Sequence, residues 1–299
     1  MARLARALIG FERLMSGVHR RSIQVDDHKI VYSEGGRGDT VLLLHGFGAS
    51  GDGWNRCAAS LTRKYHVVAP DLPGWGASTR LEHASYAYPA QLDRLHRLIQ
   101  GLKLDSFHLM GHSMGGFLAA AYAARFPGQV MTLGLLAPAG MAEPQPGDLA
   151  QCVEKGDNWL VASSPAAFNR LLDNLFVRRP YIPSPVVKYL AQLAARNSAK
   201  SAKIFEDLRQ NQPPLIERLP QIQAPALIVW GDQDRVIHVS CADLFLANIK
   251  RADLVILPQC GHMPLTEKVS SWIKLYLAFL ERWSELGAAV RSHAAVGGN

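Results

Sequence analysis

The sequence predicts an α/β protein in which a mostly parallel sheet of eight strands is flanked by helices and carries one long helical insertion. The first observation is a hairpin pattern followed by six short apolar runs, at residues 40–45, 66–70, 106–111, 132–137, 225–230 and 253–257. The second is that helical patterns separate most of these runs, as right-handed crossovers between parallel strands require. The third is the gap at residues 139–214, which is too long for a loop.

Residues 1–21 are predicted to form an amphipathic helix that precedes the sheet. Apolar residues recur there at steps of three and four, which places them on one helical face. They are Leu4, Leu8, Phe11, Met15 and Val18, and the arginines fall largely off that stripe. Such a helix lies in the headgroup layer of an anionic membrane, or it docks on its own protein or on a second copy. Both interpretations stay open on the sequence alone.

Residues 22–138 and 215–285 are predicted to form the sheet and the helices that cover it. The first two strands flank Asp26-Asp27-His28, which indicates a hairpin. Later strands end in loops that carry glycine, histidine and acidic residues. Because the carboxyl ends of parallel strands meet at one edge of a sheet, that edge is the expected place for a site.

Ser113 lies between Gly111 and Gly115 in G-x-S-x-G spacing. The run before it predicts a strand, and residues 117–124 predict a helix packed closely against the sheet. A serine on so tight a turn is forced toward unfavourable backbone angles, and the two glycines remove side chains that would clash. Such strain is typical of an exposed nucleophile at a helix N-terminus. The alternative is a glycine-rich turn that happens to contain a serine.

A serine nucleophile needs a histidine base that a carboxylate orients. Asp234 follows the run at residues 225–230, and His262 follows the run at residues 253–257. The candidate catalytic residues therefore occur in the order Ser113, Asp234, His262, each on a loop after a strand. Asp232 is the rival acid, and its position nearer the strand end favours a role in supporting the turn.

The reaction also needs backbone N–H groups that bind the developing oxyanion. His45-Gly-Phe-Gly48 follows a buried strand, and its position supplies the N–H of Phe47. The second donor is the N–H of Met114, directly after the serine. We expect the side chain of His45 to brace this loop rather than to react.

The insertion at residues 139–214 is predicted to form a helical cap over the serine. It contains apolar helical patterns punctuated by prolines. Leu175 and Phe176 from this segment, together with Met263 beside the histidine, are predicted to bind the substrate's acyl chain. Residues 286–299, rich in Ala and Gly, are predicted to be a flexible tail.

These motifs together resemble the α/β-hydrolase superfamily, over residues 22–285. Within it, H-G-F-G-A-S-G-D-G-W-N, the serine turn and C-G-H-M-P-L-T-E are similar to bacterial monoacylglycerol lipase and esterase relatives. The resemblance implies Asp234 as the acid. It implies a serine carboxylic-ester hydrolase that acts on monoacylglycerol or other short-to-medium acyl esters through an acyl-enzyme. Epoxide hydrolases and haloalkane dehalogenases of the superfamily carry aspartate at the position of Ser113, which argues against both.

Two alternatives remain within the superfamily. Carbon–carbon bond hydrolases of the meta-cleavage type share the triad and the cap, but they usually have tryptophan directly after the histidine. Met263-Pro-Leu follows His262 here, an apolar run that suits an alkyl chain better. The other alternative is a non-catalytic hydrolase-fold receptor. Ester hydrolysis of this kind requires no metal and no organic cofactor.

The amino-acid composition limits the kinds of partner that this protein can bind. More than half of the net charge of +7 lies in residues 1–21, and the remainder is too small to suggest a nucleic-acid surface. The four cysteines show no paired spacing, which predicts free thiols in a reducing compartment. We expect a cytoplasmic protein that binds a small-molecule acyl ester or monoacyl lipid, with peripheral contact to the inner membrane through residues 1–21 as a further possibility. The oligomeric state does not follow from the sequence.

Overall fold

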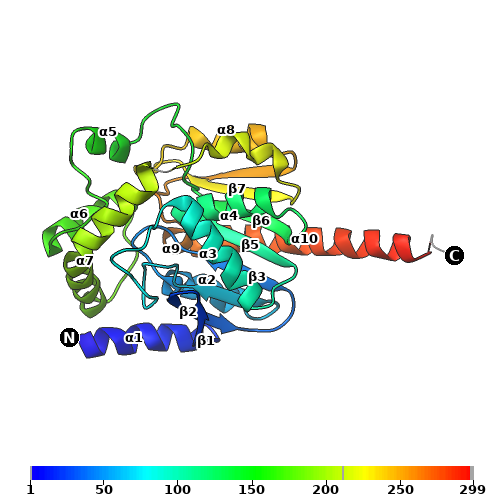
Figure 1. The fold of residues 1–299 in the computed structure, drawn as a ribbon, viewed down its shortest axis with the longest axis horizontal. Coiled ribbons are helices and arrows are strands. Elements are labelled where there is room, and N and C mark those ends of the chain that lie inside the picture. The colour runs from blue at the N-terminus through cyan, green and yellow to red at the C-terminus, as the bar shows by residue number, and fades with distance from the viewer. Residues whose placement is uncertain (1, 211, 297–299) are drawn as a thin grey trace.

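The computed structural model describes residues 2–210 and 212–296 and contains one sheet in the order β1-β2-β4-β3-β5-β6-β7-β8 (Figure 1). β1 and β2 form an antiparallel hairpin, β2 pairs antiparallel with β4, and all later pairs are parallel. The predicted mostly parallel sheet of eight strands is therefore confirmed. Its strands are β1 (Val18–Val25), β2 (His28–Gly35), β3 (Thr40–Leu44), β4 (His66–Pro70), β5 (Phe107–His112), β6 (Val130–Leu136), β7 (Ala226–Gly231) and β8 (Ala252–Leu257).

Helices cover both faces of the sheet and bury an apolar core on each. One core joins the sheet to α3 (Tyr88–Gly101), α4 (Met114–Arg125) and α8 (Cys241–Asn248). The other joins it to α2 (Asn55–Leu61), α9 (Pro264–Glu267) and α10 (Val269–Val296). In α4 every residue from Met114 to Ala124 is buried, because its glycines and alanines let the helix lie close to the sheet. Three single-turn 3₁₀ segments complete the core: η1 (Gly51–Trp54), η2 (Leu215–Glu217) and η3 (Leu219–Gln221).

Three helices fall between β6 and β7, within the insertion predicted at residues 139–214; we call them the cap. They are α5 (Asp148–Glu154), α6 (Pro165–Leu175) and α7 (Ser184–Gln210), and they lie beside the sheet at the left of Figure 1. Ser164 caps the start of α6: its hydroxyl accepts a hydrogen bond from the N–H of Ala167, and proline occupies the first turn. The cap packs around an apolar cluster of its own, centred on Phe168 and Leu172.

The N-terminal segment differs from the helix predicted for residues 1–21. Helix α1 (Ala2–Met15) ends before Gly17, which has a φ of 72° and thus the left-handed conformation that ends helices. Val18 then begins β1, pairs with Gly35 and is only 3% exposed. The prediction was wrong at this boundary because Val18 also fits the helical stripe of α1. Pairing with β2, a contact distant in sequence, decides the outcome.

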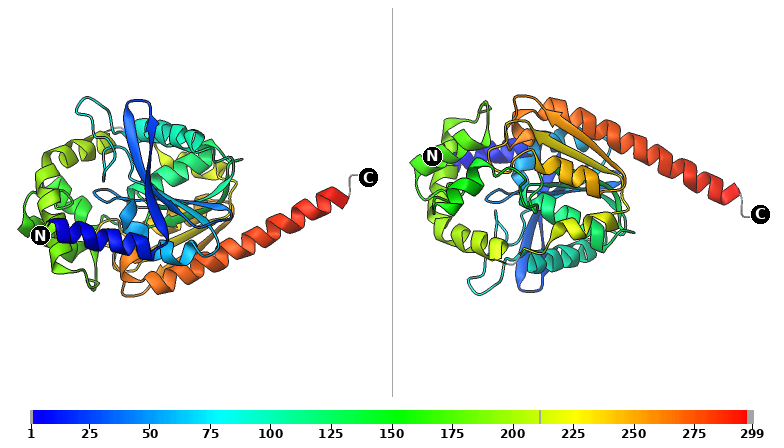
Figure 2. Two further views of the ribbon diagram at one scale, coloured as in Figure 1. Left: turned by 90° about the horizontal axis from the view of Figure 1, so that it is seen from below. Right: turned by 90° about the horizontal axis from the view of Figure 1, so that it is seen from above.

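The C-terminal segment also differs from expectation. α10 continues as a helix to Val296, where the sequence predicts a flexible tail over residues 286–299, and its far end projects from the body (Figure 2). Alanine has the highest helix propensity, and a helix already docked on the sheet needs no new nucleus to extend. Residues 297–299 lie outside the described residues.

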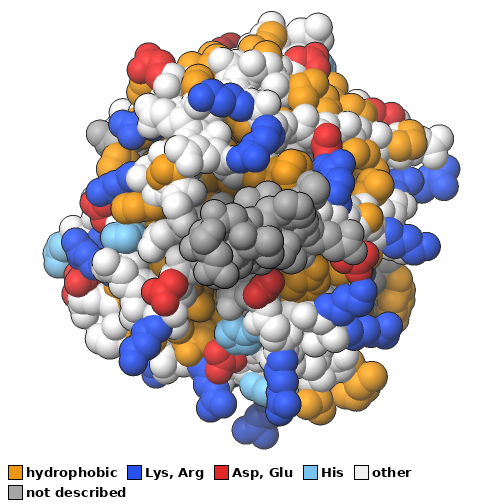
Figure 3. All heavy atoms as spheres, turned by 90° about the vertical axis from the view of Figure 1, so that its right-hand side faces the viewer, with side chains coloured by type: hydrophobic (Ala, Val, Ile, Leu, Met, Phe, Trp, Pro, Cys, Tyr) orange, Lys and Arg blue, Asp and Glu red, His pale blue; other side chains and the backbone are white. Residues whose placement is uncertain are grey.

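Acidic and basic side chains are interspersed on the face from which α10 projects (Figure 3). This mixture agrees with the near balance of charge outside the N-terminal segment. Among the described residues, no helix has both the length and the apolar character needed to cross a bilayer.

Candidate active site

Ser113 stands on a strained turn between β5 and α4, with φ 54° and ψ −118°. Its glycine neighbours are required by close backbone contacts. A Cβ at Gly111 would lie 2.1 Å from the carbonyl oxygen of Gly115, and one at Gly115 would lie 2.3 Å from that of Leu44. The turn therefore needs glycine at both positions, which explains the G-x-S-x-G spacing in physical terms.

His262 and Asp234 meet at the carboxyl edge of the sheet. Nδ1 of His262 lies 2.8 Å from Oδ2 of Asp234, and both residues are buried. The other oxygen of Asp234 accepts hydrogen bonds from the N–H groups of Val236 and Ile237, at 2.8 and 3.0 Å. The carboxylate is thus fixed in position, and it orients the imidazole.

Asp232 has a different partner. Its Oδ1 accepts a hydrogen bond from the N–H of Cys260 at 3.1 Å, which holds the turn that leads to His262. The structure thus brings Asp234, and not Asp232, to the histidine. Cys260 itself is fully buried, and burial raises the pKa of its thiol to about 12, so it stays protonated.

The loop of His262 joins the serine turn to the cap. The backbone oxygen of His262 accepts a hydrogen bond from Nε2 of His112 at 2.8 Å. The backbone N–H of His262 donates to the oxygen of Leu175 at 2.9 Å. Glu267 adds a second link, because its carboxylate accepts hydrogen bonds from the N–H of Gly261 and from that of Arg178, which lies between α6 and α7. Sequence reasoning missed both His112 and Glu267. A histidine directly before the serine was the available signal for the first.

The loop that carries Phe47 lies directly against the serine. A Cβ built on Gly46 would lie 3.1 Å from Cβ of Ser113. Among the described residues, the N–H groups of Phe47 and Met114 donate no backbone or side-chain hydrogen bond, which leaves both free for a ligand. The ring of Phe47 packs on Trp75 and on Phe205 of α7, with centroid distances of 4.6 and 5.8 Å.

His45 braces this loop, as expected. Its Nδ1 donates to the oxygen of Gly46 at 2.7 Å, and its Nε2 accepts from the N–H of Leu72 at 2.9 Å. Burial lowers the pKa of His45, so the ring remains neutral with one nitrogen as donor and the other as acceptor.

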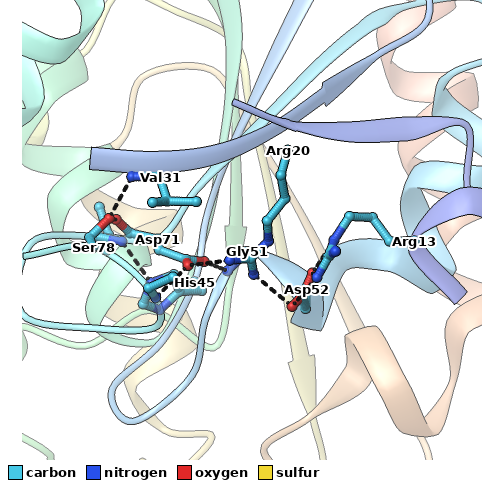
Figure 4. A network of polar contacts seen from close by, with 10 residues as sticks. Arg13, Arg20, Val31, His45, Gly51, Asp52, Asp71 and Ser78 are labelled. Carbon is cyan, nitrogen blue, oxygen red and sulfur yellow. Dashed lines mark hydrogen bonds and ion pairs between the residues drawn. The ribbon is translucent and has the colours of Figure 1, made fainter. Parts of the chain in front are cut away.

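A partly buried charge network continues from this loop toward the N-terminus (Figure 4). Asp71, after β4, accepts hydrogen bonds from the N–H groups of Gly51 and Ala77, both at 2.8 Å. Arg20 of β1 lies between two carboxylates, 3.5 Å from Asp71 and 2.8 Å from Asp52. Arg13 of α1 also binds Asp52. The network fixes α1 and β1 to the segment that follows the Phe47 loop.

The three predicted acyl-binding residues lie together. Leu175, Phe176 and Met263 belong to the same apolar cluster, where the end of α6 meets the loop of His262. Phe176 is 7% exposed, and the other two are partly buried. An apolar surface therefore borders the histidine on the cap side.

Comparison with known proteins places this geometry in a family. The family model described as alpha/beta hydrolase fold matches residues 39–269. Lipase 1 of Psychrobacter immobilis is 33% identical over 277 residues, which cover 91% of this chain and 87% of that lipase. The monoacylglycerol lipase ABHD6 of Homo sapiens is 30% identical over 293 residues, which cover 93% of this chain and 86% of that protein.

A solved structure agrees with these relatives. The crystal structure of a membrane phospholipase A, titled a novel bacterial virulence factor, is similar with a TM-score of 0.93 and 42% identity. The match covers 95% of this chain and 92% of that one. Since the family model also spans most of the sequence, this chain belongs to the α/β-hydrolase fold family.

Proposed function

We propose that this protein hydrolyses carboxylic esters through an acyl-enzyme on Ser113. The observation that carries the proposal is the buried hydrogen bond between His262 and Asp234, at the edge of the sheet where Ser113 stands. Oγ of Ser113 attacks the ester carbonyl carbon while Nε2 of His262 takes its proton. Asp234 keeps the imidazole oriented and stabilises the imidazolium that forms.

The remaining steps use the same groups. The N–H groups of Phe47 and Met114 bind the oxyanion of the tetrahedral intermediate, each contributing on the order of 3 kcal/mol to lowering the barrier. Collapse of the intermediate expels the alcohol, which takes the proton from His262. Water then attacks the acyl-enzyme with His262 as base again, and the carboxylic acid leaves Ser113 free.

The substrate class follows from the cap side of the site. Leu175, Phe176 and Met263 offer an apolar surface for an acyl chain beside His262. Relatives named as a lipase, a monoacylglycerol lipase and a phospholipase A support a lipid ester. We therefore propose monoacylglycerol or another short-to-medium acyl ester as the substrate.

Turnover of p-nitrophenyl esters of several chain lengths tests the mechanism. Ser113→Ala should lower kcat by about 10⁴-fold or more, because the triad acts as a unit. Asp234→Asn should cost far more activity than Asp232→Asn, its matched control on the same loop. Near-normal activity in Ser113→Ala would exclude the acyl-enzyme, and the reverse order of the two aspartates would reassign the acid.

We further propose that α1 binds the surface of an anionic membrane. Its outward residues Leu4, Phe11, Leu14 and Met15 are 52%, 62%, 62% and 67% exposed. The opposite side is fixed to the protein, through Arg13 to Asp52, through Glu12 to Arg56, and by packing on α7. The apolar face is therefore held outward.

Charge favours a lipid surface as the occupant of this face. Arg3 is exposed on the same helix and contributes roughly 1 kcal/mol near anionic headgroups, whereas the guanidinium of Arg6 is exposed but contacts Tyr189 of α7. A helix with an apolar face and flanking arginines lies in the interface plane. A lipid substrate would then reach the active site directly from the membrane to which the protein is bound.

Flotation with vesicles tests this contact. The protein should float with vesicles of phosphatidylglycerol and phosphatidylcholine in low salt and less with phosphatidylcholine alone. The triple variant Phe11→Ser, Leu14→Ser, Met15→Ser should lose flotation. The control Leu246→Ser, Ile256→Ser changes apolar residues of similar type that are 38% and 40% exposed elsewhere, and it should float normally. Equal flotation of both variants would refute the contact, and a halved solution mass for the triple variant alone would assign the face to a second copy.

A further inference from the structure

His112 makes a contact that the triad does not explain. It is the last residue of β5, directly before Ser113, and is 3% exposed. Its Nε2 lies 2.8 Å from the backbone oxygen of His262. A carbonyl oxygen only accepts, so this nitrogen carries the hydrogen and donates it. Nδ1 then has no hydrogen and faces the neighbouring loop, where a Cβ on Gly46 would approach it to 2.8 Å.

The position of the ring matters because His262 stands on a loop. Three contacts hold that residue: Asp234 at its ring, Leu175 at its N–H and His112 at its carbonyl oxygen. Of these, His112 is the one that is covalently attached to Ser113. The hydrogen bond thus links the backbone of His262 to the residue that directly precedes the nucleophile. An error of about 1 Å in such a position costs on the order of 10²-fold in rate.

The imidazole of His112 is also compatible with the positive charge that His262 acquires during the reaction. The rings of His112 and His262 lie 4.8 Å apart. Burial, together with His262 and His45 nearby, holds the pKa of His112 well below its usual value. His112 therefore stays neutral while His262 carries the proton taken from Ser113. A permanent cation at this position would repel that imidazolium.

We propose that His112 is a positioning residue, whose neutral N–H holds the backbone of His262 in register with Ser113. The inference rests on the proposed ester hydrolysis and adds a fourth side chain to it. The alternative is that the ring fills space between two loops. In that case the site would require the shape of the His112 ring and not its N–H.

Three substitutions separate the two roles. The side-chain nitrogen of Gln reaches about as far along the chain as Nε2 of histidine, so His112→Gln retains the donor. Asn is too short, so His112→Asn loses the donor but stays polar. His112→Phe keeps a ring of similar breadth without any N–H.

Steady-state kinetics on a p-nitrophenyl ester and thermal unfolding give the readouts. We expect His112→Phe and His112→Asn to lower kcat by about 10²-fold with KM unchanged, and His112→Gln to recover most of kcat. The rescue by Gln should hold whatever the order of the three unfolding temperatures. If His112→Phe is as active as His112→Gln, or if kcat only follows the unfolding temperature, the proposal is wrong. Failure of ester hydrolysis itself would show separately, as full activity of Ser113→Ala.

Discussion

Ser113 holds a backbone conformation that few non-glycine residues adopt, and its surroundings explain how. Its N–H donates to the oxygen of Leu136, and its own oxygen accepts from the N–H groups of Phe117 and Ala139, all at 3.0 Å. Such a conformation costs on the order of 1–3 kcal/mol and persists only where neighbours enforce it. The packing of β5, β6 and α4 therefore compensates for this conformational free energy.

Gly115→Ala should break this arrangement. The added Cβ would lie 2.3 Å from a backbone oxygen of β3, which cannot move without disturbing the sheet. We expect a loss of about 3 kcal/mol in the free energy of unfolding, measured by urea titration. Gly128→Ala is the control, because no atom lies within 4 Å of its added Cβ. Equal losses in the two variants would mean that the close contact is not what selects glycine.

His108 is a second residue with an uncommon environment. It lies in β5 with no exposed surface, and its Nδ1 bonds to the hydroxyl of Thr132 at 2.9 Å. Its Nε2 has no partner among the described residues. Burial lowers the pKa of His108 to about 4. Protonation in the folded state is therefore disfavoured.

This shift makes stability depend on pH. Between pH 6.5 and 4 the unfolded chain binds a proton at His108 that the folded protein does not, so stability is full above this window and falls as pH decreases through it. The loss from this group should reach about 3 kcal/mol. Urea titrations at pH 7 and pH 4.5 should show a smaller difference in His108→Leu than in the wild type. An unchanged difference in His108→Leu would refute the assignment.

At the scale of single residues, the sequence pointed to the candidate site because the candidate residues follow strands whose ends converge. Ser113, Asp234 and His262 are far apart in the chain, and the parallel sheet brings their loops to one edge. His112 was not recognised because its partner is a backbone oxygen 150 residues away. The histidine directly before the serine was visible in the sequence, but nothing in the sequence marks the main-chain oxygen that it binds.

Among the elements, strands were easier to predict than helix ends. The buried parallel strands are continuous apolar runs bounded by polar turns, and their positions agree within two residues. The limits of α1 and α10 depend on tertiary contacts and on propagation from a docked helix. Neither of these is a local property of the residues concerned.

The cap should control which esters are accepted. Leu175→Trp and Phe176→Ala change the size of the apolar side chains next to His262. We expect both variants to prefer a different acyl-chain length in a series of p-nitrophenyl esters. Leu193→Trp, at a residue of α7 that is 40% exposed, is the control and should leave the profile unchanged. A profile that is the same in all three variants would mean that this surface does not contact the acyl chain.

In the molecule as a whole, the sequence predicted the number of strands in the sheet. The order of the strands was not predicted, because pairing across the sheet is not encoded in any single run. The charge network from Arg13 to Asp71 was also not predicted. It joins four segments that lie apart in the sequence: α1, β1, η1 and the loop after β4.

The near-complete burial of the site has a kinetic consequence. Ser113, Asp234 and His262 are 8%, 5% and 3% exposed, and we therefore expect an inhibitor such as a fluorophosphonate to reach the serine only when the protein opens. Opening then becomes a first-order step that precedes the chemistry. As reagent concentration rises, the inactivation rate should approach a ceiling that is the same for fluorophosphonates of different intrinsic reactivity. Stopped-flow inactivation would measure that ceiling as the opening rate of the molecule, and ceilings that scale with reactivity would show that the resting site is already accessible.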